Sequence, residues 1–334
     1  MKVVIINTYD VAGGAAIAAL RLAKALEKQN IDITMLVQKK KTDEQIVQQT
    51  NNNFFNRKKK LFYFAFERLL FKFKERDPSV RFDFSIANIG EDISKHKLVQ
   101  DADIIHFHWI NFGFLSLKSL SKIFALKKTI IWTLHDMWPF TGGCHHAYEC
   151  NNYVQQCGNC PFLKKPFEND LSFKIWAKKN ALFSNQKLNI VSVSSWLSQR
   201  AKNSSLFKNK SHYVIANALN SVFEPVDKII ARKKLGADSN KIILLFGSVK
   251  IDNPIKGFKY FVEALNILKQ NSKIDNDNVL IYILGTVKNN KEALLEQLPF
   301  EYKYFGFVKD EKKLINIYSA STLTIATSLY ETFG

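Results

Sequence analysis

Short runs of aliphatic, β-branched residues alternate with segments of helical periodicity along this chain. The first run, KVVIIN at residues 2–7, is mostly apolar, as is typical of a parallel strand buried on both faces. After a Gly-Gly turn, alanine and leucine recur at helical spacing over residues 15–26, with basic residues opposite. A chain that repeats this unit is restricted to a doubly wound α/β fold. The same pattern predicts strands at 31–37, 103–108, 129–134, 190–194 and 212–216.

A second α/β series begins near residue 240, with predicted strands at 242–246, 279–284 and 322–326. The 334 residues agree with this, because domains average roughly 150 residues. We therefore predict an α/β protein of two Rossmann-like domains, 1–220 and 221–334. The fingerprint G-x-G-x-x-G is absent, which argues against a nicotinamide or flavin cofactor.

The positive charge is concentrated in the first part of the chain. Lysine and arginine exceed aspartate and glutamate by 48 − 30 = 18, and residues 251–334 hold ten of each. Such an excess predicts an anionic partner. The densest segment, 56–76, has eight bases, two acids and interleaved aromatic residues. It suits a helix on an anionic membrane surface, or equally a helix packed on the sheet with its bases in water. No nucleic-acid motif is present, so nucleic acid is not an expected partner.

The chain lacks the apolar run of about 20 residues that spans a bilayer. Its N-terminus begins directly in a strand pattern and offers no signal-peptide cleavage site, so we expect a cytoplasmic protein.

All four cysteines lie in one predicted loop, 137–165. The spacing C-x5-C-x6-C-x2-C matches a tetrahedral zinc site in ligand number, and such a site would brace the loop without taking part in chemistry. Four reduced cysteines packing the loop, or a disulfide formed on oxidation, are the alternatives. The four are Cys144, Cys150, Cys157 and Cys160.

Chemistry-bearing residues gather where predicted strands end, which is where open α/β sheets bind ligands. Gly13 and Gly14 separate the first strand from the first helix, where backbone amides attract phosphate. His135 and Asp136 end another strand, and His108 ends a third. The D-x-D sequences at 101–103 and 275–277 precede strands, so we do not expect them to hold metal.

Several longer stretches of the sequence are typical of one protein family. The sequence resembles the family 4 glycosyltransferases of the GT-B fold, in the branch that builds bacterial surface polysaccharides. The resemblance rests on the Gly13-Gly14 turn, TLHDMWPFTGGCHHAYEC (133–150), VSVSSWL (191–197), NALNSVFEP (217–225), FGSVKIDNPIKGFKYFVEAL (246–265), ILG (283–285) and ATSLYETFG (326–334).

This resemblance implies transfer of a sugar, with retention of configuration, from a nucleotide-diphosphate sugar to a hydroxyl of a glycan or lipid-linked glycan acceptor. It implies no catalytic cofactor. It places Gly13 and Gly14 at the donor phosphates and His135 on the donor sugar. Asp136 and His108 are expected at the substrates because they lie at strand ends.

In the second domain the resemblance places Lys256 on the departing diphosphate, where charge develops and a cation is needed. Glu331 matches the first carboxylate of an E-x7-E pair. Relatives often carry an arginine where this chain has Ser248 or Ile255, so Lys250 is the expected substitute.

The second carboxylate of that pair would fall near position 339, beyond Gly334. We therefore expect the second domain to be truncated within its donor site. An inactive fragment, or a binding module that keeps the first GT-B half, is the alternative to an active enzyme.

Overall fold

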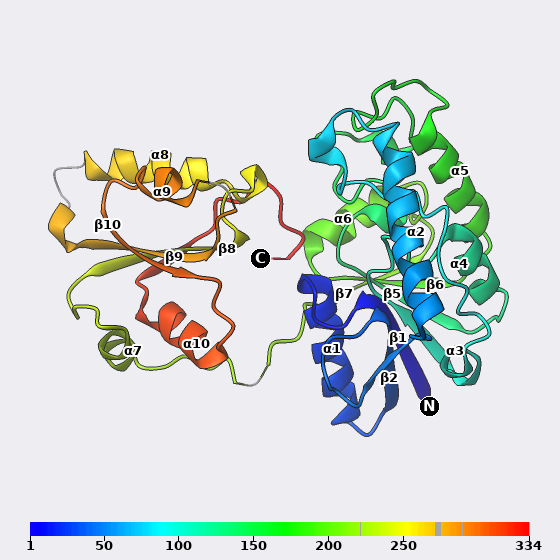
Figure 1. The fold of residues 1–334 in the computed structure, drawn as a ribbon, viewed down its shortest axis with the longest axis horizontal. Helices are drawn as coiled ribbons and strands as arrows, with labels where there is room; N and C mark the ends of the chain where they lie inside the picture. The colour runs from blue at the N-terminus through cyan, green and yellow to red at the C-terminus, as the bar shows by residue number, and fades with distance from the viewer. Residues whose placement is uncertain (221, 271–274, 289, 334) are drawn as a thin grey trace. The chain divides into compact units, whose positions relative to one another are not determined.

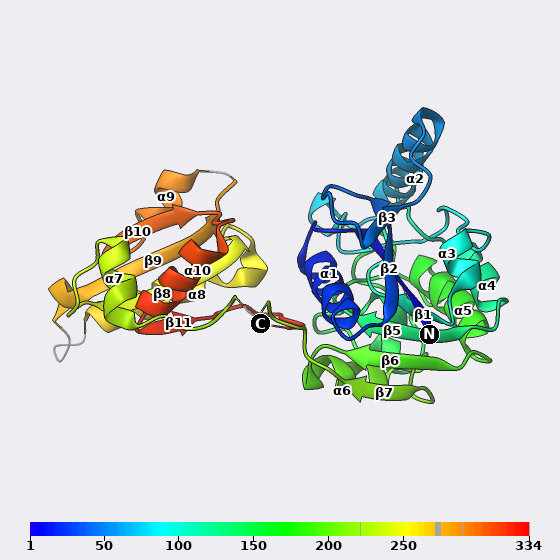
Figure 2. The same cartoon turned by 90° about the horizontal axis from the view of Figure 1, so that it is seen from below.

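The computed structural model describes residues 1–220, 222–270, 275–288 and 290–333. The chain forms two compact units, built mainly from Met1–Ala218 and from Leu219–Thr332 (Figures 1 and 2). Ser221 and Gly334 lie outside the described residues. They belong to the stretches 217–225 and 326–334, which contribute to the family resemblance. None of the described helices has the length and apolar character needed to cross a membrane.

The first unit is built on a seven-stranded parallel sheet of order β3-β2-β1-β4-β5-β6-β7. The order reverses between β1 and β4, so the carboxyl ends of these two strands form the topological switch point at which such sheets bind ligands. The strands are β1 (Lys2–Tyr9), β2 (Asp32–Lys39), β3 (Val47–Gln49), β4 (Ile104–Phe107), β5 (Thr129–Leu134), β6 (Leu188–Ser192) and β7 (Ser211–Val214).

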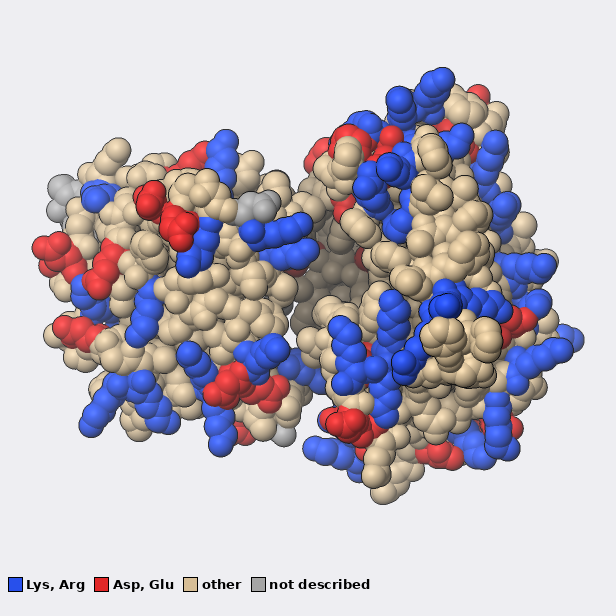
Figure 3. Space-filling view, in the orientation of Figure 1, with Lys and Arg blue, Asp and Glu red and all other residues tan. Residues whose placement is uncertain are grey.

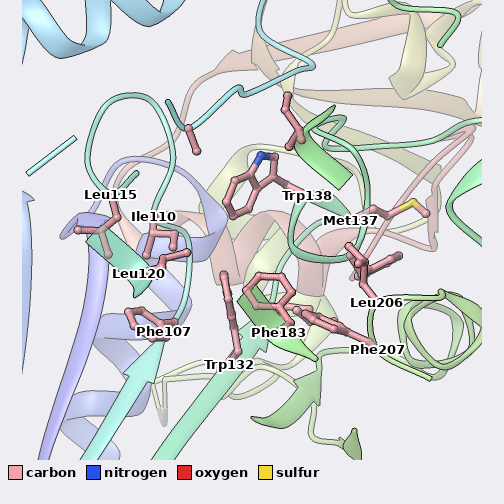
Figure 4. Packing of buried hydrophobic residues seen from close by; sticks show 14 of the residues in the cluster. Phe107, Ile110, Leu115, Leu120, Trp132, Met137, Trp138, Phe183, Leu206 and Phe207 are labelled. Atoms are coloured by element: carbon pink, nitrogen blue, oxygen red, sulfur yellow. The ribbon is translucent and has the colours of Figure 1, made fainter. Parts of the chain in front are cut away.

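Both faces of this sheet are buried, because successive side chains of a strand point to opposite faces. Val3 and Ile5 of β1 pack in a cluster with residues of the first helix, whereas Val4 and Ile6 belong to the larger cluster on the other face. That larger cluster is rich in aromatic rings (Figure 4). It includes Phe107, Trp132, Trp138, Phe183 and Phe207.

The helices of the first unit follow the strand alternation with one addition. The second helix projects from the body of the unit (Figure 2), and its buried positions are Lys60, Glu67, Arg68 and Phe71. The helices are α1 (Gly14–Glu27), α2 (Phe54–Lys72), α3 (Lys97–Asp101), α4 (Leu117–Phe124), α5 (Leu171–Phe183) and α6 (Ser195–Asn203).

The second unit has a four-stranded parallel sheet of order β10-β9-β8-β11. Leu244 and Phe246 of β8 pack against α8, and Ile243 and Leu245 pack in the cluster that contains residues of α7 and α10. The expected fold class, two parallel α/β units, is therefore confirmed. The elements are α7 (Lys228–Leu235), β8 (Ile242–Lys250), α8 (Phe258–Lys269), β9 (Val279–Thr286), α9 (Lys291–Leu295), β10 (Glu301–Gly306), α10 (Glu311–Ala320) and β11 (Leu323–Ile325).

Candidate active site

The turn between β1 and α1 carries the first predicted site residues. Gly13 has φ 90° and is the N-cap residue of α1. Because glycine has no side chain, no capping side chain accepts a hydrogen bond from the first backbone amides of the helix. Nothing lies within 4 Å of the position that a Cβ would occupy on either Gly13 or Gly14. The turn is therefore open on the side where a ligand would approach the helix N-terminus.

A buried carboxylate holds this turn in place. Asp10, which follows β1, accepts hydrogen bonds from the backbone N–H groups of Lys41 and Thr42, each at 2.8 Å, and from the Thr42 hydroxyl at 2.9 Å. Burial works to raise the pKa of Asp10, but these hydrogen bonds outweigh it and hold the pKa below its usual value. Asp10 thus ties the end of β1 to the end of β2.

Three histidines line the ends of β4 and β5. A ring nitrogen of His108 lies 2.9 Å from Nε2 of His135, and His106 Nε2 lies 2.7 Å from the Thr133 hydroxyl. Burial lowers the pKa of His135 to about 4 and that of His106 to about 3. At neutral pH these imidazoles are neutral, so each can donate one hydrogen bond and accept another.

His106, His108 and Thr133 also line a cavity of about 360 Å³ on the α1 side of the sheet. The structure brings together the two predicted histidines, His108 and His135, although they are far apart in the sequence.

Asp136 is fully engaged within the protein. Its Oδ2 accepts hydrogen bonds from the indole N–H of Trp109 at 2.8 Å and from Nδ1 of His145 at 2.6 Å, and its Oδ1 accepts the backbone N–H of Trp138 at 2.9 Å. His145 continues through Nε2 to the Ser85 hydroxyl at 3.0 Å.

The Asp136–His145–Ser85 chain has the connectivity of a nucleophilic triad. All three residues are buried, however, and Ser85 is wholly inaccessible to solvent. These hydrogen bonds therefore stabilise the loop after β5 and do not form a reactive site. A contact of Asp136 with substrate stays a prediction.

In the second unit, two predicted residues meet. Lys256 Nζ lies 2.5 Å from Oε1 of Glu331, although 75 positions separate them in the sequence. Both side chains are about one-third exposed. They form a partly solvated ion pair beside the N-terminus of α8.

The turn before α8 fixes this geometry. Gly257 has φ 69°, and a Cβ there would lie 2.0 Å from the carbonyl oxygen of Thr327. The Thr327 hydroxyl donates to the Gly257 carbonyl at 2.8 Å, and Leu329 N–H donates to the Ile255 carbonyl at 2.8 Å. Only glycine allows the two segments to approach so closely.

Ser248 and Lys250 lie at the irregular end of β8, where the pairing with β9 shifts register. The Ser248 hydroxyl donates to the Lys250 carbonyl at 3.2 Å. The Lys250 side chain is exposed and has no ion pair among the residues that the structure describes. Its proposed role as a substitute cation stays a prediction.

The four cysteines are free thiols in the loop between β5 and α5. Burial raises the pKa of Cys144 and of Cys157 to about 12. Within the described part of the chain, no three or more cysteine, histidine or carboxylate side chains are grouped so that they could hold an ion. Zinc binding therefore stays a prediction.

Comparison with known proteins identifies the family. The Glycosyltransferase Family 4 profile matches residues 12–222, which is more than half of the chain. This chain belongs to the family 4 glycosyltransferases. A second profile, that of the group 1 glycosyl transferases, matches residues 227–334.

Individual relatives agree with this family. WcaC of Escherichia coli K12, whose name assigns it to glycosyl transfer in colanic acid biosynthesis, is 33% identical over 88 residues. The match covers 24% of this glycosyltransferase and only 22% of the length of WcaC.

Solved structures share the fold. Sucrose-phosphate synthase of Thermosynechococcus elongatus is 15% identical, with a TM-score of 0.60 over 100% of this chain and 77% of that one. HepE of Anabaena, in complex with UDP and glucose, is 14% identical, with a TM-score of 0.55 over 100% of this chain and 76% of that one. At these identities the likeness supports the GT-B fold and no further detail.

Several residues that hold the candidate residues of each unit in place were not singled out from the sequence. Asp10, Ser85 and Thr327 act through contacts with segments far away in the chain, which no local pattern reveals. His145 lies within the stretch TLHDMWPFTGGCHHAYEC that carries the family resemblance, but no role was predicted for it. Its partner Ser85 lies in none of the quoted stretches.

Proposed function

We propose that this protein transfers a sugar from a nucleotide-diphosphate sugar to an acceptor hydroxyl, with retention of anomeric configuration. The observation that carries the proposal is the convergence of Lys256 and Glu331 beside the N-terminus of α8. The HepE structures contain UDP, glucose or UDP-glucose, which supports a nucleotide-sugar donor in a protein of the same fold.

Lys256 and Glu331 supply complementary chemistry. The departing diphosphate gains negative charge, and an ammonium group placed on it stabilises that charge. A carboxylate accepts hydrogen bonds from sugar hydroxyls. A partly exposed ion pair contributes only about 0–1 kcal/mol, so a bound donor can separate Lys256 from Glu331 at small cost. Each group then has its own partner on the donor.

His135 serves as a neutral hydrogen-bonding group in this proposal. Because burial lowers the pKa of His135 to about 4, the ring carries no charge at pH 7. Its contact with His108 orients the ring at the carboxyl end of β5. It can therefore bond a sugar hydroxyl without adding a charge to the site.

The test is donor turnover with Lys256→Ala and a matched control. Lys259→Ala removes a lysine three positions later, which pairs with Glu263 on the surface of α8. With a panel of UDP- and GDP-sugars, we expect K256A to lose about 100-fold or more of the turnover and K259A to keep it. Equal turnover in both variants would refute the assignment. Donor binding without any turnover in the unmutated chain would favour the binding module.

We also propose that the acceptor is a lipid-linked surface glycan, and that the protein works from the cytoplasm against an anionic membrane. The support comes from α2, whose polarity is inverted. Its buried positions include Lys60, Glu67 and Arg68, whereas Phe55 is 79% exposed and Phe62 is 53% exposed. An apolar stripe that faces water suggests a surface to be covered.

The buried polar residues of α2 find partners inside the unit. The Lys60 ammonium donates to the carbonyls of Gln38 and Thr50, at 3.0 and 3.2 Å. Arg68 donates to the carbonyl of Phe84 at 2.7 Å and pairs with Glu67 at 3.1 Å. These contacts fix which face of α2 is turned outward.

The outward face combines aromatic and basic residues as a membrane-surface helix does. Lys58 lies over the ring of Phe54 at 4.4 Å, and Lys59 lies near Tyr63. On the face of this unit drawn in Figure 3, blue basic side chains are more widespread than red acidic ones. Near an anionic bilayer each such base contributes about 1 kcal/mol.

Liposome co-sedimentation tests this part. We expect binding to vesicles that contain anionic lipid and not to neutral vesicles, and we expect Lys58→Glu with Lys59→Glu to weaken it at least tenfold. Lys60 is left unchanged because it is buried. The charge-matched control is Lys233→Glu with Lys234→Glu, on exposed positions of α7. Equal pelleting of both double variants would overturn the proposal.

A further inference from the structure

The four cysteines of this chain converge on one small space. They occupy 17 residues, 144–160, between β5 and α5, and all four line the same cavity. The cavity measures about 20 Å³, close to the space that a single water-sized sphere needs. The other lining side chains include Phe84, Phe162 and Tyr153, so the space offers few partners for water apart from the sulfur atoms.

Two glycines, Gly142 and Gly158, allow close backbone contacts around the thiols. The Gly142 N–H donates to Sγ of Cys157 at 3.1 Å. A Cβ on Gly142 would lie 2.7 Å from Cβ of Cys157 and 2.4 Å from the Ser172 carbonyl oxygen. Gly158 has φ 153°, and a Cβ there would lie 2.3 Å from the Glu168 carbonyl oxygen. The Cys157–Cys160 turn is therefore held against its surroundings at two glycines.

A buried lysine faces the same cluster. Lys179 of α5 is 0% exposed and donates to the carbonyls of Trp138 and Thr141, the second at 3.0 Å. The hydroxyl of Thr141 donates to the carbonyl of Cys144, and the N–H of the next residue, Gly142, donates to Sγ of Cys157, so Lys179 lies beside the cysteine segment. A nearby anion stabilises a buried ammonium group, and thiolates formed on metal binding would supply that anion.

We propose that Cys144, Cys150, Cys157 and Cys160 bind one zinc ion as four thiolates, with Lys179 as the compensating cation. Binding displaces four protons from the four thiols, and the zinc–thiolate group carries a net charge of −2. Protonated Lys179 reduces this to −1, and the Gly142 amide stabilises the Cys157 thiolate. Among the described residues the four thiols are not grouped closely enough to hold an ion, so binding requires their side chains to reorient towards one point.

The consequence of the site is mechanical. The loop that carries the cysteines also carries His145, which holds Asp136 beside the candidate active site. A zinc ion fixed by four ligands would brace this loop. The metal would then support the position of His135 without contacting the donor.

Metal analysis of the full chain, purified under reducing conditions without chelator, tests the proposal. We expect about one zinc per chain, and a drop below one tenth in Cys157→Ser with Cys160→Ser. His146→Gln is the matched control, because His146 neighbours Cys144–His145 but does not line the cavity. It should keep its zinc. Loss of zinc from H146Q would overturn the four-cysteine assignment.

Should the double serine variant not fold, the unmutated chain still decides the question. The reduced, metal-free protein should take up one equivalent of zinc in competition with a chromophoric chelator and release protons as it does so. Its thiols should react with a thiol reagent only when zinc is removed. Absence of uptake, or oxidation of the thiols to disulfides without loss of stability, would overturn the proposal.

Discussion

Replacement of Gly257 by alanine tests the contact that brings Lys256 to Glu331. Gly257 is in the left-handed region at φ 69°, and its Cβ would lie 2.0 Å from the Thr327 carbonyl. Gly236, at the end of α7, has nearly the same φ of 64° and open space around it. The pair therefore separates the cost of the backbone conformation from the cost of the steric clash.

The magnitudes follow from these two environments. Both alanines incur about 1–2 kcal/mol for the left-handed conformation. Gly257→Ala adds about 1–3 kcal/mol for overpacking against a backbone atom that must move. This difference corresponds to roughly 5- to 150-fold, since each 1.4 kcal/mol is tenfold. The segment 327–331 would shift, and Glu331 would separate from Lys256.

Hydrogen exchange is the suitable assay. All five tryptophans lie in the first unit, so fluorescence does not report on the second. Amides of β8 and β9 should exchange roughly 5- to 150-fold faster in G257A than in G236A. Donor turnover should fall only in G257A. Equal exchange and equal turnover in the two variants would refute the reasoning that the Gly257–Thr327 contact holds the site.

Three further predictions concern the first unit and the active site. Asp136→Asn leaves His145 and Trp109 without a charged acceptor and should destabilise the first unit by about 1–3 kcal/mol, measured by urea unfolding with tryptophan fluorescence; an unchanged midpoint would count against a bracing role. The folded-state pKa of His135, about 4, lies below its ordinary value, so the unfolded chain binds more protons in between and stability should fall as the pH drops from about 6.5 towards 4. His106 contributes to the same slope, so His135→Gln should make the profile less steep, and a flat profile or an unchanged slope in that variant would contradict the prediction. Lys60→Met removes the ammonium donor from the Thr50 carbonyl and one of two side-chain donors from the Gln38 carbonyl, and it should destabilise the first unit without changing membrane binding, which the same vesicle assay checks.

The fold class could be predicted because it depends on repeated local patterns, and the family could be predicted because several stretches of the sequence resemble it. Apolar parallel strands read clearly, and the observed β2 and β8 extend the predicted strands by only a few residues. The three-residue strand β3 was missed, since a run so short has no periodicity of its own.

The polarity of α2 could not be predicted in the same way. The segment 56–76 reads as amphipathic, but which face is buried depends on acceptors that come from elsewhere. The carbonyls of Gln38, Thr50 and Phe84 take up Lys60 and Arg68, and the aromatic residues remain outside. Long-range hydrogen bonding overrides the ordinary preference of lysine and arginine for the surface.

The structure altered the expected role most for those candidate site residues whose partners lie far away in the sequence. Lys256 and Glu331 were expected in separate roles. Their contact could not be predicted from the sequence, because it depends on the packing of the Gly257 turn against Thr327. Asp136 was expected at the substrate, but its oxygens are occupied by neighbours within the fold.

Calorimetric binding of nucleoside diphosphates tests the central claim most directly. UDP and GDP are compared with uridine and guanosine, so that the diphosphate is the varied group, in the unmutated chain, K256A and K259A. The account predicts that at least one diphosphate binds more tightly than its nucleoside, and that K256A alone removes tenfold or more of that preference. Equal binding of nucleoside and diphosphate, or equal affinities in K256A and K259A, would contradict it.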